Sequence, residues 1–305
     1  MGRRVSLSLS LCLCVVIVAP PKTFRAHAAD RPHSTNVNFE LYRDYLIVLQ
    51  ARVGPLKGLN FLLDTGATPS VLDPHTAARL HLQLTSAEIA VLQGTAHGAT
   101  ATVPSLQVGP VLKENLPVLV EDLSFVQKVV PVHLDGIVGL DVLGGSPFTI
   151  DYTTREIRFG PFAGLASSTP MESKQGLPLV NATMNGQSVL LLLDTGAPSL
   201  ILFKRPPVPG IRAASFDVSS GSIGEYDHKS FRLSSLGIGS ASFPHPSAYV
   251  VTTPGGSAHG FDGVMSPVAL GLRGWSSIFP TAKYPFPQLG GRLCELVSHF
   301  PEEVL

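Results

Sequence analysis

The sequence contains few cysteines and few charged residues. The first shortage limits the disulfides that the chain could form, and the second limits the partners that it could bind through charge. Of the three cysteines, Cys12 and Cys14 lie in an apolar N-terminal run. Cleavage of that run would leave Cys294 alone, so the mature chain could form no internal disulfide. Only 14% of the residues are charged, and 22 Lys and Arg balance 22 Asp and Glu. This balance gives no bulk charge that would attract nucleic acid or an anionic membrane, and we expect neither as a partner.

Motifs for metal binding and for a covalent nucleophile are also missing. The ten histidines form no His-Glu-x-x-His pair and no other metal-ligand spacing, and the sequence has no Gly-x-Ser-x-Gly segment. We therefore expect neither a metal site nor a cofactor. Beyond the N-terminus, no apolar stretch reaches the roughly 20 residues that a membrane-spanning helix needs.

The N-terminus has the organisation of a secretory signal peptide. Arg3 and Arg4 precede an apolar or small stretch at residues 5–19, and Ala26-His27-Ala28 places small residues around a larger one. This order predicts removal of residues 1–28 and export to the periplasm or the extracellular space. The alternative is a membrane anchor, for which the apolar run is short.

Short apolar runs, separated by glycine and proline, make up most of the remaining chain. The sequence has 29 glycines and 26 prolines, and residues 45–49, 116–120 and 189–193 are rich in Val, Ile or Leu. Such runs are typical of buried strands. Only residues 74–82 read comfortably as a short helix, so the sequence predicts a mostly β protein.

One motif, LLDTGA, occurs twice, at residues 62–67 and 192–197. Each copy follows a segment that reads as strand, Gly-containing turn and strand. Further along each half, LQVGPVLKENLPVLV answers LGIGSASFPHPSAYVV, and the segment DGIVG at 135–139 answers DGVMS at 262–266. Matched features in the same order indicate that one lobe has been duplicated within the chain.

The duplication suggests a division of the chain. We assign residues 29–160 to an N-terminal lobe and residues 177–287 to a C-terminal lobe. Residues 161–176 are rich in small and turn residues and are expected to form a linker. Residues 288–305 are expected to be a tail that has no counterpart in the first lobe.

The repeated motif resembles that of the pepsin-like and retropepsin-like aspartic proteases. In that family, an apolar run ends in Asp-Thr-Gly, and a later segment supplies an Asp-Gly followed by two apolar residues. The resemblance implies a two-lobed acid protease fold and an aspartic endopeptidase that acts on peptide or protein substrates. It also implies that Asp64 and Asp194 form the catalytic pair. Because one chain carries both aspartates, we expect a monomer.

The chemistry gives a physical reason for two copies. Two carboxyl groups held close together cannot both ionise easily, so they share one proton. The ionised member can then take a proton from water while the protonated member hydrogen-bonds the substrate carbonyl. Asp64 and Asp194 would be this dyad, and one lobe alone would hold half a site.

The resemblance also assigns supporting roles to neighbouring residues. Threonine hydroxyls would bond across the lobe interface, glycines would allow a sharp turn, and apolar residues would pack behind each turn. The expected dyad supports are Thr65, Gly66, Ala67, Thr195, Gly196 and Ala197. The expected loop backing consists of Ile137, Val138, Gly139, Val264 and Met265.

The alanines that close the motif predict a working pH. Many pepsin-like enzymes carry Ser or Thr at the positions of Ala67 and Ala197, and that hydroxyl bonds the catalytic carboxylate. Alanine offers no such bond, and losing a bond to the ionised form raises a carboxyl pKa. We therefore expect less acidic operation than that of pepsin.

A β-hairpin flap covers the dyad in the family. Residues 93–102, which include Gly94 and Gly98, lie at a suitable place in the first lobe, and residues 219–228 are their counterpart. Tyr226 could bond substrate from the second hairpin, although an exposed loop tyrosine is the simpler interpretation.

The second lobe departs from the pattern in two ways. Ser266 stands where the first lobe has Gly139. Prolines at positions 280, 285 and 287 interrupt the segment that should match the hairpin ending the first lobe, so we expect that end to be incomplete or rearranged. The alternative function is therefore a catalytically silent, two-lobed protein that binds an extended peptide in its cleft.

Overall fold

The computed structural model describes residues 36–91, 94–160, 169–174, 176–203, 212–221, 224–251, 260–278 and 292–297. Over these residues the protein consists mostly of β-strands, with a few short helical turns. The prediction of a mostly β, two-lobed fold is confirmed. The predicted signal peptide, residues 1–28, lies outside the described residues.

The first lobe comprises ten strands and three short helices. Its elements are β1 (Asn36–Tyr42), β2 (Leu46–Val53), β3 (Leu56–Leu63), β4 (Val71–Leu72), α1 (Pro74–Arg79), β5 (Thr85–Val91), β6 (Gly94–Val108), β7 (Val111–Val120), α2 (Ser124–Gln127), β8 (Gly136–Val138), α3 (Leu140–Leu143), β9 (Phe148–Asp151) and β10 (Glu156–Phe159).

The second lobe comprises twelve described strands and one 3₁₀ turn. Its elements are β11 (Thr169–Lys174), β12 (Leu177–Met184), β13 (Gln187–Leu193), β14 (Leu200–Phe203), β15 (Arg212–Gly221), β16 (Gly224–Arg232), β17 (Ser235–Ile238), β18 (Ala241–Pro244), β19 (Ser247–Val251), β20 (Gly263–Met265), η1 (Val268–Leu270), β21 (Gly274–Ile278) and β22 (Arg292–Val297).

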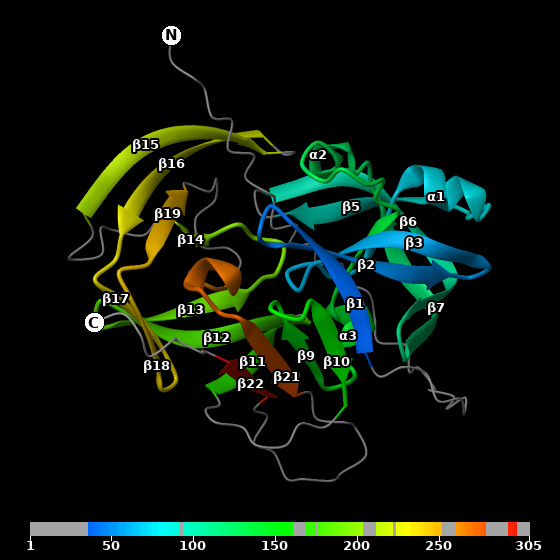
Figure 1. Ribbon diagram of the computed structural model, residues 1–305. Coiled ribbons are helices and arrows are strands. Elements are labelled where there is room, and N and C mark those ends of the chain that lie inside the picture. Colours follow the sequence, from blue (N-terminus) through cyan, green and yellow to red (C-terminus); the bar gives the residue numbers. More distant parts are fainter. Residues whose placement is uncertain are drawn as a thin grey trace.

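The two lobes repeat one strand arrangement. In the first, the hairpin β2–β3 places β3 parallel to β8, while β4 runs parallel to β7 and antiparallel to β8. In the second, β12–β13 places β13 parallel to β20, while β14 runs parallel to β19 and antiparallel to β20. The long hairpins β5–β6 and β15–β16 lie on opposite sides of the molecule (Figure 1).

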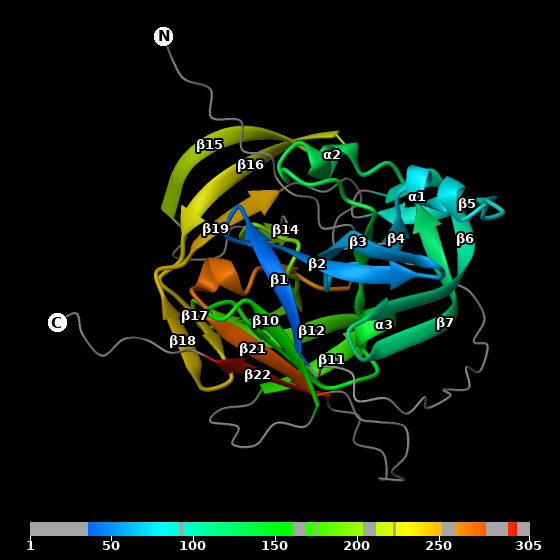
Figure 2. The same cartoon turned by 45° about the vertical axis from the view of Figure 1, so that its right-hand side comes forward.

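A shared sheet joins the lobes. Strands from both halves pair in the order β1–β10–β9–β21–β22–β11, and β11 also pairs with β12. Figure 2 shows β10, β21, β22 and β11 of this sheet in the lower part of the molecule. The hairpin β21–β22 matches the hairpin β9–β10. Residues 292–297, which we expected to belong to an unmatched tail, instead form a strand of the shared sheet. The described strand β21 ends before the prolines at 280, 285 and 287, and β22 begins after them.

The predicted linker also contributes to this sheet. Residues 169–174, which a turn-rich composition placed between the lobes, form β11 and pair with both β12 and β22. The expected helix at 74–82 is shorter than predicted. The Asp73 side chain caps its N-terminus by accepting a bond from the His75 N–H, and the helix ends at Arg79 before His81 adopts a positive φ.

Both buried apolar clusters contain residues of both lobes, and one of them holds the first leucine and the closing alanine of both copies of the doubled motif. It includes Leu62, Ala67 and Ile137 of the first lobe together with their counterparts Leu192, Ala197 and Val264 of the second. The alternation of buried and exposed residues along the second half of β2 shows the period of a strand with one covered face. The doubled motif thus lies where the cores of the two lobes meet.

Candidate active site

Each aspartate directly follows a buried strand. Strand β3 ends at Leu63 and β13 ends at Leu193, so Asp64 and Asp194 occupy the same place in their lobes. The Asp64 N–H donates to Val138 O at 3.0 Å, and the Asp194 N–H donates to Met265 O at 3.0 Å. The parallel strands β8 and β20 therefore hold the two aspartates in the same way. We call residues 64–67 the Asp64 turn and residues 194–197 the Asp194 turn.

Within each turn, a glycine amide fixes the carboxyl group. The Gly66 N–H donates to Asp64 Oδ1 at 2.8 Å, and the Gly196 N–H donates to Asp194 Oδ1 at 2.7 Å. Asp64 is 1% exposed and Asp194 is fully buried. Equivalent glycines in the two turns thus orient the two carboxyl groups in the same way.

The threonines tie the two turns together across the lobe interface. Thr65 Oγ1 donates to Leu193 O at 2.7 Å and accepts the Thr195 N–H at 3.1 Å. Reciprocally, Thr195 Oγ1 donates to Leu63 O at 2.9 Å and accepts the Thr65 N–H at 3.1 Å. These four buried bonds satisfy the N–H groups of both threonines and the carbonyl groups of Leu63 and Leu193, and they fix the relative position of the turns.

The two carboxyl groups lie close enough for each to affect the ionisation of the other. A Cβ atom at position 196 would lie only 2.7 Å from Asp64 Oδ2, so the Asp64 carboxyl packs directly against the Asp194 turn. Gly196 is therefore required for space, because any side chain there would displace the opposite carboxyl group.

The paired arrangement raises the pKa of Asp64 well above its ordinary value. Burial is the largest cause, followed by the charge of Asp194 and the hydrogen bond with it. The N–H groups of Gly66 and Ala67 oppose the rise. These opposing bonds come from the main chain alone, since Ala67 has no hydroxyl to add. A dyad in this environment retains one proton to a higher pH than an isolated aspartate would.

Four of the residues expected to back the turns are buried on strands that pair with β3 or β13. Ile137 and Val138 pair with β3, Val264 and Met265 pair with β13, and all four are buried. In the first lobe, a Cβ atom at position 139 would overlap the Ala67 carbonyl oxygen, so Gly139 allows the close approach. Position 139 therefore controls how tightly the Asp64 turn packs.

Sequence reasoning missed a buried polar pair in the first lobe. Ser70 and Asp141 bond to each other behind the Asp64 turn. Neither residue belongs to the repeat, because the register places Leu200 and Val268 at the matching positions. A comparison of the two halves could have found this pair, because each polar residue of the first lobe matches an apolar residue of the second.

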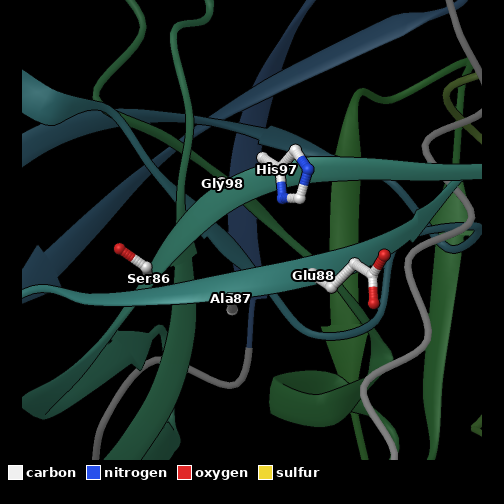
Figure 3. Close-up of a pocket in the computed structure, with 5 residues that line it drawn as sticks. All are labelled: Ser86, Ala87, Glu88, His97 and Gly98. Carbon is white, nitrogen blue, oxygen red and sulfur yellow. The ribbon is translucent and has the colours of Figure 1, made fainter.

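The hairpin β5–β6 contains the predicted first-lobe flap segment. Gly94 and Gly98 lie on β6, and Glu88 on β5 stands opposite His97. An open depression of about 560 Å³ is lined by Ser86, Ala87, Glu88, His97 and Gly98 (Figure 3). This depression is not lined by either aspartate. In the second lobe, Tyr226 lies on β16 opposite Ser219, and its side chain is outside the described part of the chain.

Among the described residues, no group of three or more His, Cys, Asp or Glu residues is arranged to hold a metal ion. No helix in the same part of the chain is both long and apolar enough to cross a membrane.

Comparison with known families agrees with the geometry of the first lobe. A search of curated proteins finds no significant match. Residues 49–142, however, match the model of a family described as aspartyl protease. The matched segment contains Asp64, its turn and the strand β8 behind it, and ends before Asp194. This match supports a general aspartyl protease function, and the first lobe is the part of the chain that is similar to that family.

Proposed function

We propose that the protein is an aspartic endopeptidase that hydrolyses peptide bonds with a water molecule activated between Asp64 and Asp194. The observation that carries the proposal is the close approach of two buried aspartates, on turns joined by reciprocal threonine bonds, with the Asp64 carboxyl group packed against the Asp194 turn. The match of residues 49–142 to aspartyl proteases supports it independently.

The mechanism follows from one shared proton. The ionised carboxylate removes a proton from the attacking water, while the protonated carboxyl group donates a hydrogen bond to the peptide carbonyl oxygen. Attack produces a tetrahedral intermediate, and the proton taken from water is then available for the leaving amine. The bonds from Gly66 and Gly196 hold the carboxyl groups in place, so little reorganisation is needed during the reaction.

A cleavage assay with a mixed peptide library tests this proposal. We expect turnover by the wild-type protein and none above background for Asp64→Asn or Asp194→Asn. A statine-type transition-state mimic should inhibit the wild type. A catalytically silent peptide binder would bind library peptides equally well in all three proteins and would cleave none of them.

The pH dependence provides a second test. The environment of Asp64 favours its protonated form, and no hydroxyl at position 67 or 197 stabilises the ionised form. The proposed enzyme should therefore work at a less acidic pH than pepsin. A rate profile with its maximum in strong acid would contradict this expectation.

We further propose that the enzyme is exported and acts as a monomer. The signal-like N-terminus supports export, and the presence of both aspartates in one chain removes the need for a second copy. Sequencing the N-terminus of the secreted protein tests the first point. Sedimentation of the active protein tests the second, and activity that depended on dimer formation would contradict it.

A further inference from the structure

A buried hydrogen-bonded pair lies behind the Asp64 turn. Ser70 precedes β4, and Asp141 belongs to α3. The Ser70 N–H donates to Asp141 Oδ2 at 2.8 Å, and Ser70 Oγ donates to Asp141 Oδ1 at 2.7 Å. The Val142 N–H also donates to Oδ1, at 3.0 Å. Three donors therefore fix the Asp141 carboxyl group, and Ser70 is fully buried.

This pair is connected to the Asp64 turn through Gly139. The Gly139 N–H donates to Ser70 Oγ at 3.0 Å. Gly139 in turn packs against the carbonyl group of Ala67, and the preceding residue, Val138, accepts the Asp64 N–H. The chain of contacts from Asp141 through Ser70 to Gly139 thus reaches both ends of the Asp64 turn.

The second lobe forms the same strand arrangement without this pair. Leu200 occupies the position of Ser70, and Val268 occupies that of Asp141. The Ser266 N–H donates instead to the main-chain oxygen of Ser199, at 3.3 Å. Because the fold repeats without the pair, the strand arrangement alone does not require it. A role specific to the Asp64 turn explains its presence in one lobe.

We infer that Ser70 and Asp141 are positioning residues that hold the Asp64 carboxyl group in its reactive orientation through Gly139. This inference rests on the proposed endopeptidase function and extends it. Neither side chain touches the reacting atoms. Their effect is geometric, and a displacement of about 1 Å in a reacting group can cost about 100-fold in rate.

Kinetics of matched serine variants test the inference. In Ser70→Ala, the Gly139 N–H loses its acceptor, so kcat should fall at least about tenfold while KM stays within about twofold. The control is Ser199→Ala, which removes a serine hydroxyl near the Asp194 turn and should leave kcat unchanged. A wild-type kcat in Ser70→Ala would overturn the inference.

Carboxyl variants separate positioning from stability. Asp141→Asn keeps the Oδ1 acceptor for Ser70 Oγ and Val142, so its kcat should lie between those of the wild type and Asp141→Ala. The control is Asp135→Asn, which alters a buried carboxylate bonded to the Asn60 N–H and Thr76 Oγ1. That control should lower the melting temperature with little loss of kcat. If kcat fell equally in Asp135→Asn and Asp141→Asn, the effect would be structural and the inference wrong.

Amide hydrogen exchange distinguishes this inference from the proposed function. If the wild-type protein cleaved no peptide, the proposed function would fail, but the position of the Asp64 turn could still be measured. The Gly66 N–H bonds to Asp64 Oδ1, so its protection reports on that carboxyl group. Ser70→Ala should reduce this protection, and Ser199→Ala should not. Equal protection in both variants would overturn the positioning role regardless of turnover.

Discussion

The two lobes share their strand pairing but differ in what lies behind their aspartates. The Asp64 turn rests on Gly139, Ser70 and Asp141, which form a continuous set of hydrogen bonds. In the second lobe Ser266 occupies the position of Gly139, and its buried hydroxyl has no hydrogen-bond partner within the described ranges. The bonds that place each carboxyl group are the same in both lobes. Within the described residues, the Ser70–Asp141 pair occurs in the first lobe only.

The largest expected change in stability comes from replacing Thr65 or Thr195. These two threonines make equivalent bonds in the two turns, so we expect equal effects. Thr65→Val would leave Leu193 O and the Thr195 N–H buried without their partner, at a cost of about 1–3 kcal/mol for each group. Thr195→Val should cost the same, because it breaks the reciprocal pair. Urea unfolding measures both losses.

A threonine that acts within one lobe serves as the control. Thr76→Val removes a buried bond to Asp135 and should lower stability without affecting the association of the lobes. If Thr65→Val and Thr195→Val differed strongly from each other, the symmetry of the two turns would be refuted.

Gly139→Ala should have the next largest effect. The added methyl group would overlap the Ala67 carbonyl oxygen, and relief would require the Asp64 turn to move. Overpacking of this kind costs about 1–3 kcal/mol. We expect that loss in a denaturation experiment, together with reduced peptide cleavage. An alanine variant with wild-type stability and activity would show that the first lobe does not need its glycine.

Asp64→Asn should stabilise the protein by an amount that depends on pH. The pKa of Asp64 is raised in the folded state, so wild-type stability is fullest below the ordinary pKa near 3.8 and falls as pH rises through the folded pKa. Asparagine cannot ionise and avoids this loss. Its melting temperature should exceed the wild-type value by a few degrees, on the order of 2–4 °C per kcal/mol, at neutral pH. The difference should vanish in acid, and a difference that grew in acid would contradict the assigned sign.

The smallest expected change in stability comes from replacing one buried serine in each lobe. Ser266→Ala removes a buried hydroxyl that has no partner in the described structure, so stability should rise by up to about 1 kcal/mol. Ser70→Ala makes the same chemical change in the first lobe and should lower stability, because its hydroxyl both donates and accepts. Thermal unfolding of the two variants should therefore give shifts of opposite sign. Shifts of the same sign would contradict the proposed difference between the two serine hydroxyls.

Sequence alone predicted the features that a short motif encodes. The apolar run, the aspartate and the glycine are adjacent in the chain, so their doubling predicted two similar turns. The short apolar runs separated by glycine and proline predicted the mostly β fold. The Ser70–Asp141 pair escaped prediction because its members lie 71 residues apart and have no polar counterpart in the other half. The hairpin β21–β22 escaped because prolines between two strands look the same in sequence as prolines within one.

Cleavage by the two single aspartate variants and by the double variant tests the central claim most directly. If Asp64 and Asp194 act as one dyad, Asp64→Asn and Asp194→Asn should each lower kcat/KM by at least about 1,000-fold, and the double variant should lose no more than either single one. Independent losses that multiply in the double variant, or substantial turnover in either single variant, would contradict the paired mechanism.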